Sequence, residues 1–244
     1  MIFNADVNAA EAAQFHEKYK GIELYTSPIK RDAKYDEDVT SNTKALKTIR
    51  EAINLIYIKS IYSAGKIDFL KKQGRVIIIY DPNVPDPNVP TASLLMAQFY
   101  PKYLRDSNTK GLGSTKDFLV IVTRIGILQD LTDVASVVVH ELVGHGIQHQ
   151  RGRLDAMRII DIECEAWLYQ ERSYQDFEIN KFSKKMGRFR TQLEDRECSD
   201  FRRHQAAKYP KAYKLWDAIN PNVPKLLINF EKYLDDIGGS VMKP

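Results

Sequence analysis

The chain has 244 residues, of which 43% are hydrophobic and 28% are charged, and its 36 basic against 32 acidic residues give a formal net charge of +4. This composition is typical of an ordinary globular protein and excludes the disordered, fibrous and membrane-embedded classes. The net charge is too small to predict nucleic-acid binding from the chain as a whole.

The two cysteines exclude a disulfide-rich scaffold and a zinc site built from four thiolates. We therefore expect Cys164 to be buried as a small apolar side chain. The N-terminal segment lacks the basic start and continuous apolar core of a signal peptide, and no apolar run is long enough to span a membrane. The expectation is a protein that does not enter membranes and is cytoplasmic, or is exported without a cleavable signal peptide.

Hydrophobic periodicity predicts helices in the first part of the chain, over 9–19 and over 41–64, with Gly65 as the terminator of the second. One or two further helical turns are expected over 67–73. Residues 75–80, RVIIIY, are short and β-branched and predict a strand.

The middle of the chain alternates loops with a strand and a helix. Four prolines make 81–90 an extended loop, and two glycines make 106–116 another. Residues 118–124 predict the second strand, and the helix that follows is expected to begin near Asp130 or Thr132 and end near His149. The rest of the chain reads as helix, with segments over 156–186, 187–207, 211–219 and 224–237.

This order of helices, few strands and further helices lacks repeated strand–helix–strand units and predicts a mostly helical α+β fold with a small sheet. We expect a single domain over 1–244. Within it, 1–74 form a helical part, 75–150 a small sheet with one functional helix, and 151–244 a second helical part.

The most informative segment is 139–149, VHELVGHGIQH, which contains three of the five histidines. Zinc proteases commonly place two histidines four residues apart on a helix, with a glutamate directly after the first. Here His140 and His145 are five residues apart, so a regular α-helix would direct their side chains about 140° apart. A π-bulge, to which the backbone of Gly144 can adapt, would return them to one face.

Other ligand sets remain open at this stage. Glu141, His145 and His149 are spaced by four and would form one stripe on a regular helix, which leaves the zinc site without a base. A third ligand is expected from the downstream helix, where Glu163 and Glu165 are both candidates. Asp155 and Asp161 are candidates for orienting a ligand imidazole, although ordinary surface positions suit them better.

The segment HELVGHG resembles the HELLGH signature of the dipeptidyl peptidase III family of zinc peptidases, and Glu163-Cys164-Glu165-Ala166 resembles that family's second motif. The second segment is also similar to the glutamate-any-glutamate-alanine motif of many gluzincins. These resemblances imply a zincin-like fold of the gluzincin type with one Zn²⁺ per chain. They imply His140, His145 and Glu163 as the metal ligands and Glu141 as the general base.

Such a site predicts zinc-dependent peptide-bond hydrolysis with a peptide or protein as substrate. Zinc would acidify its water and polarise the scissile carbonyl, and Glu141 would move the proton. His204 is our candidate for stabilising the oxyanion, with Tyr169, Tyr174 and Arg203 as alternatives. The strand over 118–124 is expected to be an edge strand on which an extended substrate can pair.

A second hypothesis concerns residues 181–214, which hold 11 basic against 4 acidic residues with aromatic residues between them. Helical spacing favours core positions for those aromatics and a solvated face for the charges, so nucleic acid is not the expected partner. The alternative function is a non-catalytic helical module, stapled by zinc, that presents this basic face to an acidic partner or nucleic acid.

Overall fold

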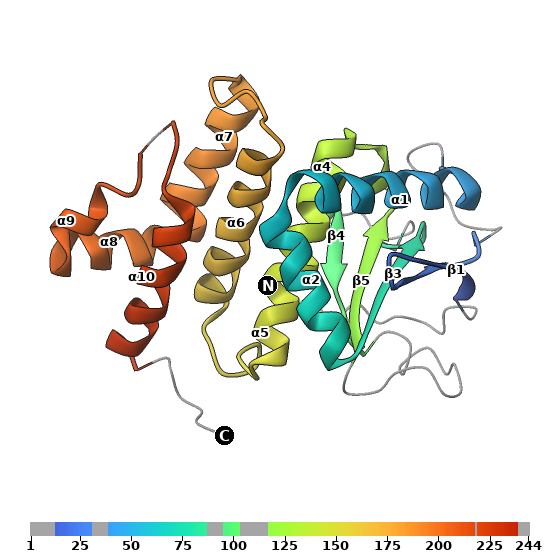
Figure 1. Ribbon diagram of the computed structural model, residues 1–244, viewed down its shortest axis with the longest axis horizontal. Coiled ribbons are helices and arrows are strands. Elements are labelled where there is room, and N and C mark those ends of the chain that lie inside the picture. Colours follow the sequence, from blue (N-terminus) through green and yellow to red (C-terminus); the bar gives the residue numbers. More distant parts are fainter. Residues whose placement is uncertain (1–12, 31–38, 87–94, 103–116, 218, 239–244) are drawn as a thin grey trace. The chain divides into compact units, whose positions relative to one another are not determined.

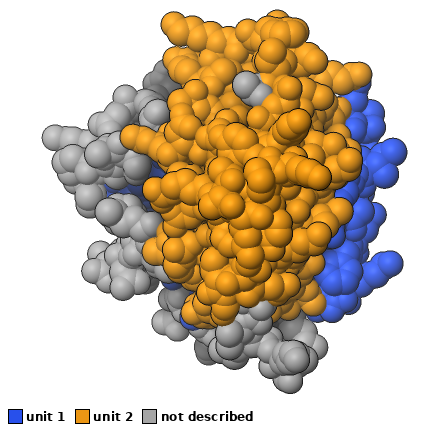
Figure 2. All heavy atoms as spheres, turned by 90° about the vertical axis from the view of Figure 1, so that its left-hand side faces the viewer, with its two compact units in different colours: residues 1–142 blue, residues 143–244 orange. Residues whose placement is uncertain are grey.

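The computed structural model describes residues 13–30, 39–86, 95–102, 117–217 and 219–238 (Figure 1). The chain divides into two compact units, Met1–Leu142 and Val143–Pro244, which Figure 2 shows in blue and orange. In the described residues the first unit combines a small sheet with helices, and the second is helical. The predicted α+β class is confirmed. Within the described ranges, no helix is both long enough and apolar enough to cross a membrane.

The first unit contains a mixed five-stranded sheet in the order β1-β2-β3-β5-β4. β1 and β2 are antiparallel, β2, β3 and β5 are parallel, and β4 runs antiparallel to β5. The strands are β1 Gln14–Tyr19, β2 Ile22–Thr26, β3 Arg75–Asp81, β4 Ala97–Phe99 and β5 Asp117–Thr123. The two strands predicted over 75–80 and 118–124 are thus β3 and β5.

Two sequence predictions about strands are wrong. The helix expected over 9–19 is strand β1 from Gln14 onward, and residues 9–12 lie outside the described part. Lys20 and Gly21 connect β1 to β2 with φ values of 47° and 80°, a two-residue turn in which positive φ matches the twist of a hairpin. Pairing with β2 therefore overrides the local helical pattern. The strand over 118–124 is also not an edge strand, because β5 lies between β3 and β4.

The helices of the first unit pack on this sheet. α1, Asn42–Lys59, begins at Ser41, whose hydroxyl accepts a hydrogen bond from the Lys44 amide. α2, Ile61–Gln73, follows after Ser60, so the expected terminator Gly65 lies inside a helix. α1 contacts α2 and α4, and both α1 and α2 contact β3 (Figure 1).

Both faces of the central strands are buried, which explains why β3 and β5 read as continuous hydrophobic runs. On one face, Ile79 and Ile121 are paired in register and pack with Tyr25. On the opposite face, Ile78 and Val120 are paired and fully buried. The loop predicted over 81–90 is described only up to 86, and the whole of the loop predicted over 106–116 lies outside the described residues.

The second unit consists of helices that are shorter than the sequence predicts. α6 ends at Asp176, near Glu178 with a φ of 59°, rather than continuing to 186. α9 comprises only Pro210–Tyr213, so the helix expected over 211–219 is present at its start but ends at Tyr213. The remaining helices are α5 Gly146–Gln150, α6 Ile159–Asp176, α7 Lys184–Gln192, α8 Ser199–Lys208 and α10 Val223–Asp236, with a π-helical turn over Leu193–Glu197.

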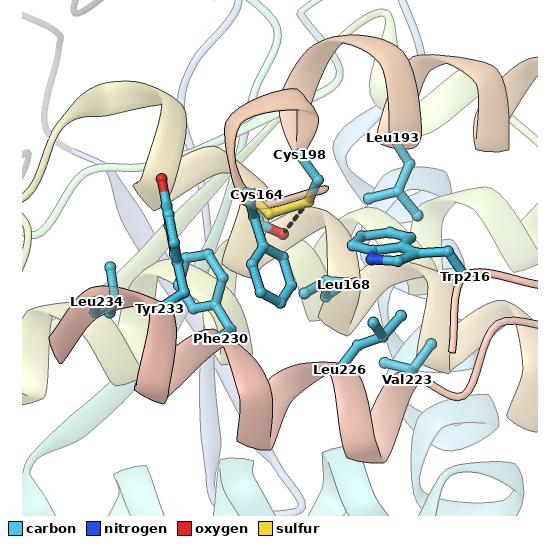
Figure 3. Close-up of a cluster of buried hydrophobic side chains, with 11 residues drawn as sticks. Cys164, Leu168, Leu193, Cys198, Trp216, Val223, Leu226, Phe230, Tyr233 and Leu234 are labelled. Atoms are coloured by element: carbon cyan, nitrogen blue, oxygen red, sulfur yellow. Dashed lines mark hydrogen bonds between the residues drawn. A yellow bond between two sulfur atoms is a disulfide. The ribbon is translucent and has the colours of Figure 1, made fainter. Parts of the chain in front are cut away.

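The core of the second unit contains a disulfide that the sequence did not predict. Cys164 of α6 is bonded to Cys198, the residue before α8, and both are buried among aromatic and aliphatic side chains (Figure 3). Phe230 and Tyr233 of α10 and Trp216 surround them. Cys164 is buried in the core as expected, but the expectation of an unpaired small side chain is wrong because it forms a disulfide with a residue 34 positions away.

Candidate metal centre

The predicted helix after β5 is present and contains the predicted distortion. α4, Leu131–Val138, continues into a π-helix over Val139–His145 and then into α5. A π-turn joins residues five apart by hydrogen bonds, whereas an α-turn joins residues four apart. Two side chains five positions apart can therefore lie one above the other, as a shared metal requires.

Three donor side chains are gathered in this helix. The ligand atoms of His140, Glu141 and His145 all lie within 4.8 Å of one another. Each residue is at most 8% exposed. Two imidazole nitrogens and a carboxylate oxygen form a donor set that zinc prefers, and buried ionisable groups are commonly stabilised by pairing or by metal. The group can thus hold a metal ion. Among the described residues, His149 does not join it, so the stripe of Glu141, His145 and His149 is not assembled.

Glu163 of α6 lies next to His145. Its Oε1 is 3.8 Å from His145 Nε2, and its side chain is 35% exposed. Two donors on a tetrahedral zinc with bonds of about 2.0–2.1 Å lie about 3.3 Å apart. A small side-chain adjustment therefore brings Glu163 within range of a metal held by His145.

Glu165, the other candidate, is directed elsewhere. It is 2% exposed, and its Oε2 accepts a hydrogen bond of 3.0 Å from Gln148. Its Oε1 lies 3.8 Å from Arg153. Burial raises the pKa of the Glu165 carboxyl, and Gln148 and Arg153 oppose this effect. Between the two glutamates left open by the sequence, the geometry favours Glu163 as a ligand.

Glu141 is held by the edge strand of the sheet. The Phe99 amide donates a hydrogen bond of 2.7 Å to Glu141 Oε2. The backbone groups of Met96 and Tyr100 bond to β5, and in an antiparallel pair alternate residues face opposite sides, so the Phe99 backbone faces away from β5. The carboxylate of Glu141 therefore lies at the outer edge of β4.

A buried glutamine is the residue that sequence reasoning missed. Gln148 is fully buried, and its Oε1 lies 2.9 Å from His145 Nδ1. Its position three residues after His145 places it on the same side of the helix, which is the signal that was available. Asp161, a candidate for orienting a ligand imidazole, instead accepts hydrogen bonds from Arg158 and Tyr233.

His204, the expected oxyanion donor, is paired with a carboxylate of helix α10. This residue lies on α8, and its Nε2 is 2.9 Å from Asp236 Oδ2. Asp236 also accepts hydrogen bonds from Tyr209 and Lys208. Among the described residues, His204 is not part of the group formed by His140, Glu141 and His145, and in Figure 1 helices α10 and α6 lie between α8 and α5.

The alternative oxyanion donors are engaged in packing or in pairing. Tyr169 and Tyr174 are both buried on α6, where Tyr174 packs edge-on against Phe189. Arg203 pairs with Asp200 on α8. None of the three is part of the metal-binding group found among the described residues.

The basic segment 181–214 is less uniformly charged than its composition implies. Four of its cations pair with carboxylates, in the pairs Arg190–Glu171, Arg202–Glu194, Arg203–Asp200 and Lys208–Asp236. Phe201 belongs to the core, as predicted for the aromatics of this segment, and Phe189 packs against it. Phe182, Tyr209 and Tyr213 are 72%, 37% and 38% exposed, so the prediction is wrong for these three.

Comparison of the chain with protein-family models, with curated proteins and with solved structures finds no match. Inference about function therefore depends on the chemistry of the residues themselves.

Proposed function

We propose that the protein is a zinc-dependent peptide hydrolase of gluzincin type, with His140, His145 and Glu163 as ligands and Glu141 as the general base. The observation that carries this proposal is the π-helix, which gathers His140, Glu141 and His145 within 4.8 Å despite their unusual spacing. π-bulges are rare and frequently occur at functional sites. A structural zinc site has no need of the additional carboxylate.

Each residue has a distinct task in this proposal. The imidazoles of His140 and His145 and the carboxylate of Glu163 would hold the metal. When bound, zinc supplies Lewis acidity toward water and toward the scissile carbonyl. Glu141 accepts the proton of the attacking water and returns it to the leaving amine. The amide of Phe99 keeps the Glu141 carboxylate oriented.

Strand β4 supports a peptide as the substrate. It is an edge strand, and at Phe99 its outward-facing amide contacts Glu141. An extended peptide that paired along this edge would bring its backbone carbonyls past the general base. The sequence predicted the strand over 118–124, which is β5, as the edge on which a substrate pairs. In the structure β4 occupies that edge, so the proposed pairing site is β4.

The test is metal content together with hydrolysis of a mixed peptide library, measured on the whole chain. We expect wild type and Glu141→Gln each to bind about one zinc per chain. His145→Ala should lose zinc, and both variants should lose hydrolysis. His149→Ala is the matched control, a histidine of the same helix outside the group, and should retain both.

Two results would contradict the proposal in different ways. Failure of the wild type to bind zinc when titrated after purification would exclude the metal site. Zinc binding with hydrolysis that persists in Glu141→Gln would leave the metal site in place and refute the assigned base. Zinc binding by the wild type without any hydrolysis of the peptide library would favour the non-catalytic, zinc-stapled module.

A further inference from the structure

Gln148 forms a relay between His145 and helix α6. Its side chain is fully buried, with Oε1 2.9 Å from His145 Nδ1. Its Nε2 lies 2.8 Å from the backbone carbonyl oxygen of Ile162 and 3.0 Å from Glu165 Oε2. These three partners of the Gln148 amide all belong to the second unit.

The contact with Ile162 determines which way the amide is oriented. A backbone carbonyl oxygen only accepts hydrogen bonds, so the amide end that faces it must be the NH₂ group. The second hydrogen of that group is directed to Glu165. The carbonyl end of Gln148 is therefore left to face the imidazole of His145, independently of the protonation state of Glu165.

This orientation in turn determines the tautomer of His145. An amide oxygen accepts but does not donate, so the hydrogen of this contact must be on His145 Nδ1. In a neutral imidazole with Nδ1 protonated, Nε2 has no hydrogen and offers its lone pair. Nε2 is the atom that lies 3.8 Å from the carboxylate of Glu163.

We propose that Gln148 is a positioning residue that holds His145 in the Nδ1-protonated tautomer, with the Nε2 lone pair directed toward Glu163. The proposal rests on the proposed function only in naming zinc as what Nε2 binds. Gln148 is itself held by the backbone carbonyl of Ile162 and by the buried carboxylate of Glu165, so the orientation of the His145 ring is set before a metal binds. Loss of such a hydrogen-bonding partner typically weakens metal binding by about 10- to 100-fold.

The first measurement reads the tautomer directly, by nitrogen-15 correlation NMR of the metal-free full chain at a pH above the ordinary imidazole pKa. We expect Nδ1–H for His145 in wild type and a mixture of tautomers in Gln148→Leu. Gln205→Leu is the matched control, a buried glutamine of the same unit that accepts a hydrogen bond from Trp216, and it should leave His145 unchanged.

The second measurement is zinc affinity by chelator competition. We expect Gln148→Leu to bind zinc about 10- to 100-fold more weakly than wild type. Gln148→Met preserves most of the side-chain volume but offers Nδ1 no amide oxygen, so it should show a similar loss, whereas a merely space-filling role of Gln148 would leave the zinc affinity of Gln148→Met unchanged.

The outcomes separate this inference from the proposed function. An Nε2–H tautomer in wild type overturns the inference, even if Gln148→Leu proves unable to fold. Unchanged zinc affinity in a folded Gln148→Leu variant also overturns it and leaves the zinc site standing. Absence of zinc binding in wild type refutes the proposed function, while an Nδ1–H tautomer that is lost in Gln148→Leu still supports the relay.

Discussion

Gly144 and Ala166 approach so closely that a side chain at position 144 has no room. A Cβ atom built on Gly144 would lie 2.7 Å from Cβ and 2.8 Å from Cα of Ala166. Real Cβ atoms are not found at such distances from backbone atoms, so one of the two helices would have to move. This contact is what places α6, with Glu163, beside the π-helix that bears His145.

Gly144→Ala should therefore separate these two helices. We expect a loss of about 1–3 kcal/mol of unfolding free energy from overpacking, with weaker zinc binding. Gly187→Ala is the matched control, because this exposed helical glycine has open space around its Cβ position and should gain up to about 1 kcal/mol. Urea unfolding and zinc titration of both variants check this. Equal zinc affinity in the two variants would contradict the role of the close approach.

The disulfide between Cys164 and Cys198 should contribute substantially to stability. Closing a chain segment of 34 residues lowers the entropy of the unfolded state. In the loop-closure model this stabilises the folded state by about 3–4 kcal/mol. Protein unfolded without reductant should show no free thiol, and reduction should lower the urea midpoint. Two reactive thiols in freshly prepared, oxidised protein would contradict the bond.

The pair of Arg190 and Glu171 is buried in the second unit, with Arg190 Nη2 3.0 Å from Glu171 Oε1 and side-chain exposures of 6% and 0%. Removal of one partner leaves an uncompensated buried charge, so Arg190→Met should cost about 3–5 kcal/mol. The double variant Arg190→Met with Glu171→Leu should recover most of this loss. Equilibrium unfolding of the single and double variants measures the effect.

The same pair predicts a dependence on pH. Burial raises the pKa of Glu171 above its ordinary value, while Arg190 opposes this effect. A carboxyl with a raised folded-state pKa takes up a proton more readily when folded, so its contribution to stability falls as pH rises above the ordinary glutamate pKa. In Arg190→Met the pKa of Glu171 should rise further, so the loss of stability should continue to a higher pH than in wild type. The same pH range in wild type and variant would contradict this effect of Arg190.

The carboxyl group of Asp236 predicts the opposite dependence of stability on pH. Hydrogen bonds from Lys208, His204 and Tyr209 lower its pKa to about 2. A carboxyl with a depressed folded-state pKa stabilises the fold above its ordinary pKa of 3.8 and loses that contribution as pH falls toward 2. The stability difference between wild type and Asp236→Asn should therefore be present near neutral pH and disappear in acid. A difference independent of pH would contradict the assignment.

The sequence by itself determined the features that are encoded over short distances along the chain. The strands β3 and β5 follow from β-branched runs, and the long helix α1 follows from a stripe of apolar residues. The π-distortion was predicted from the five-residue spacing of His140 and His145 together with Gly144. These features depend on the periodicity of neighbouring residues, which a sequence displays directly.

Only the tertiary structure decided the features that depend on distant residues. The hairpin of β1, the edge position of β4 and the pairing of Cys164 with Cys198 each require partners that no local pattern identifies. The position of Glu163 beside His145, the different direction of Glu165 and the contact of Gln148 with His145 depend on how α6 packs against the helix of His145. Side-chain direction across two packed helices is set by their approach, and a contact such as that of Gly144 with Ala166 becomes visible only once both helices are in place.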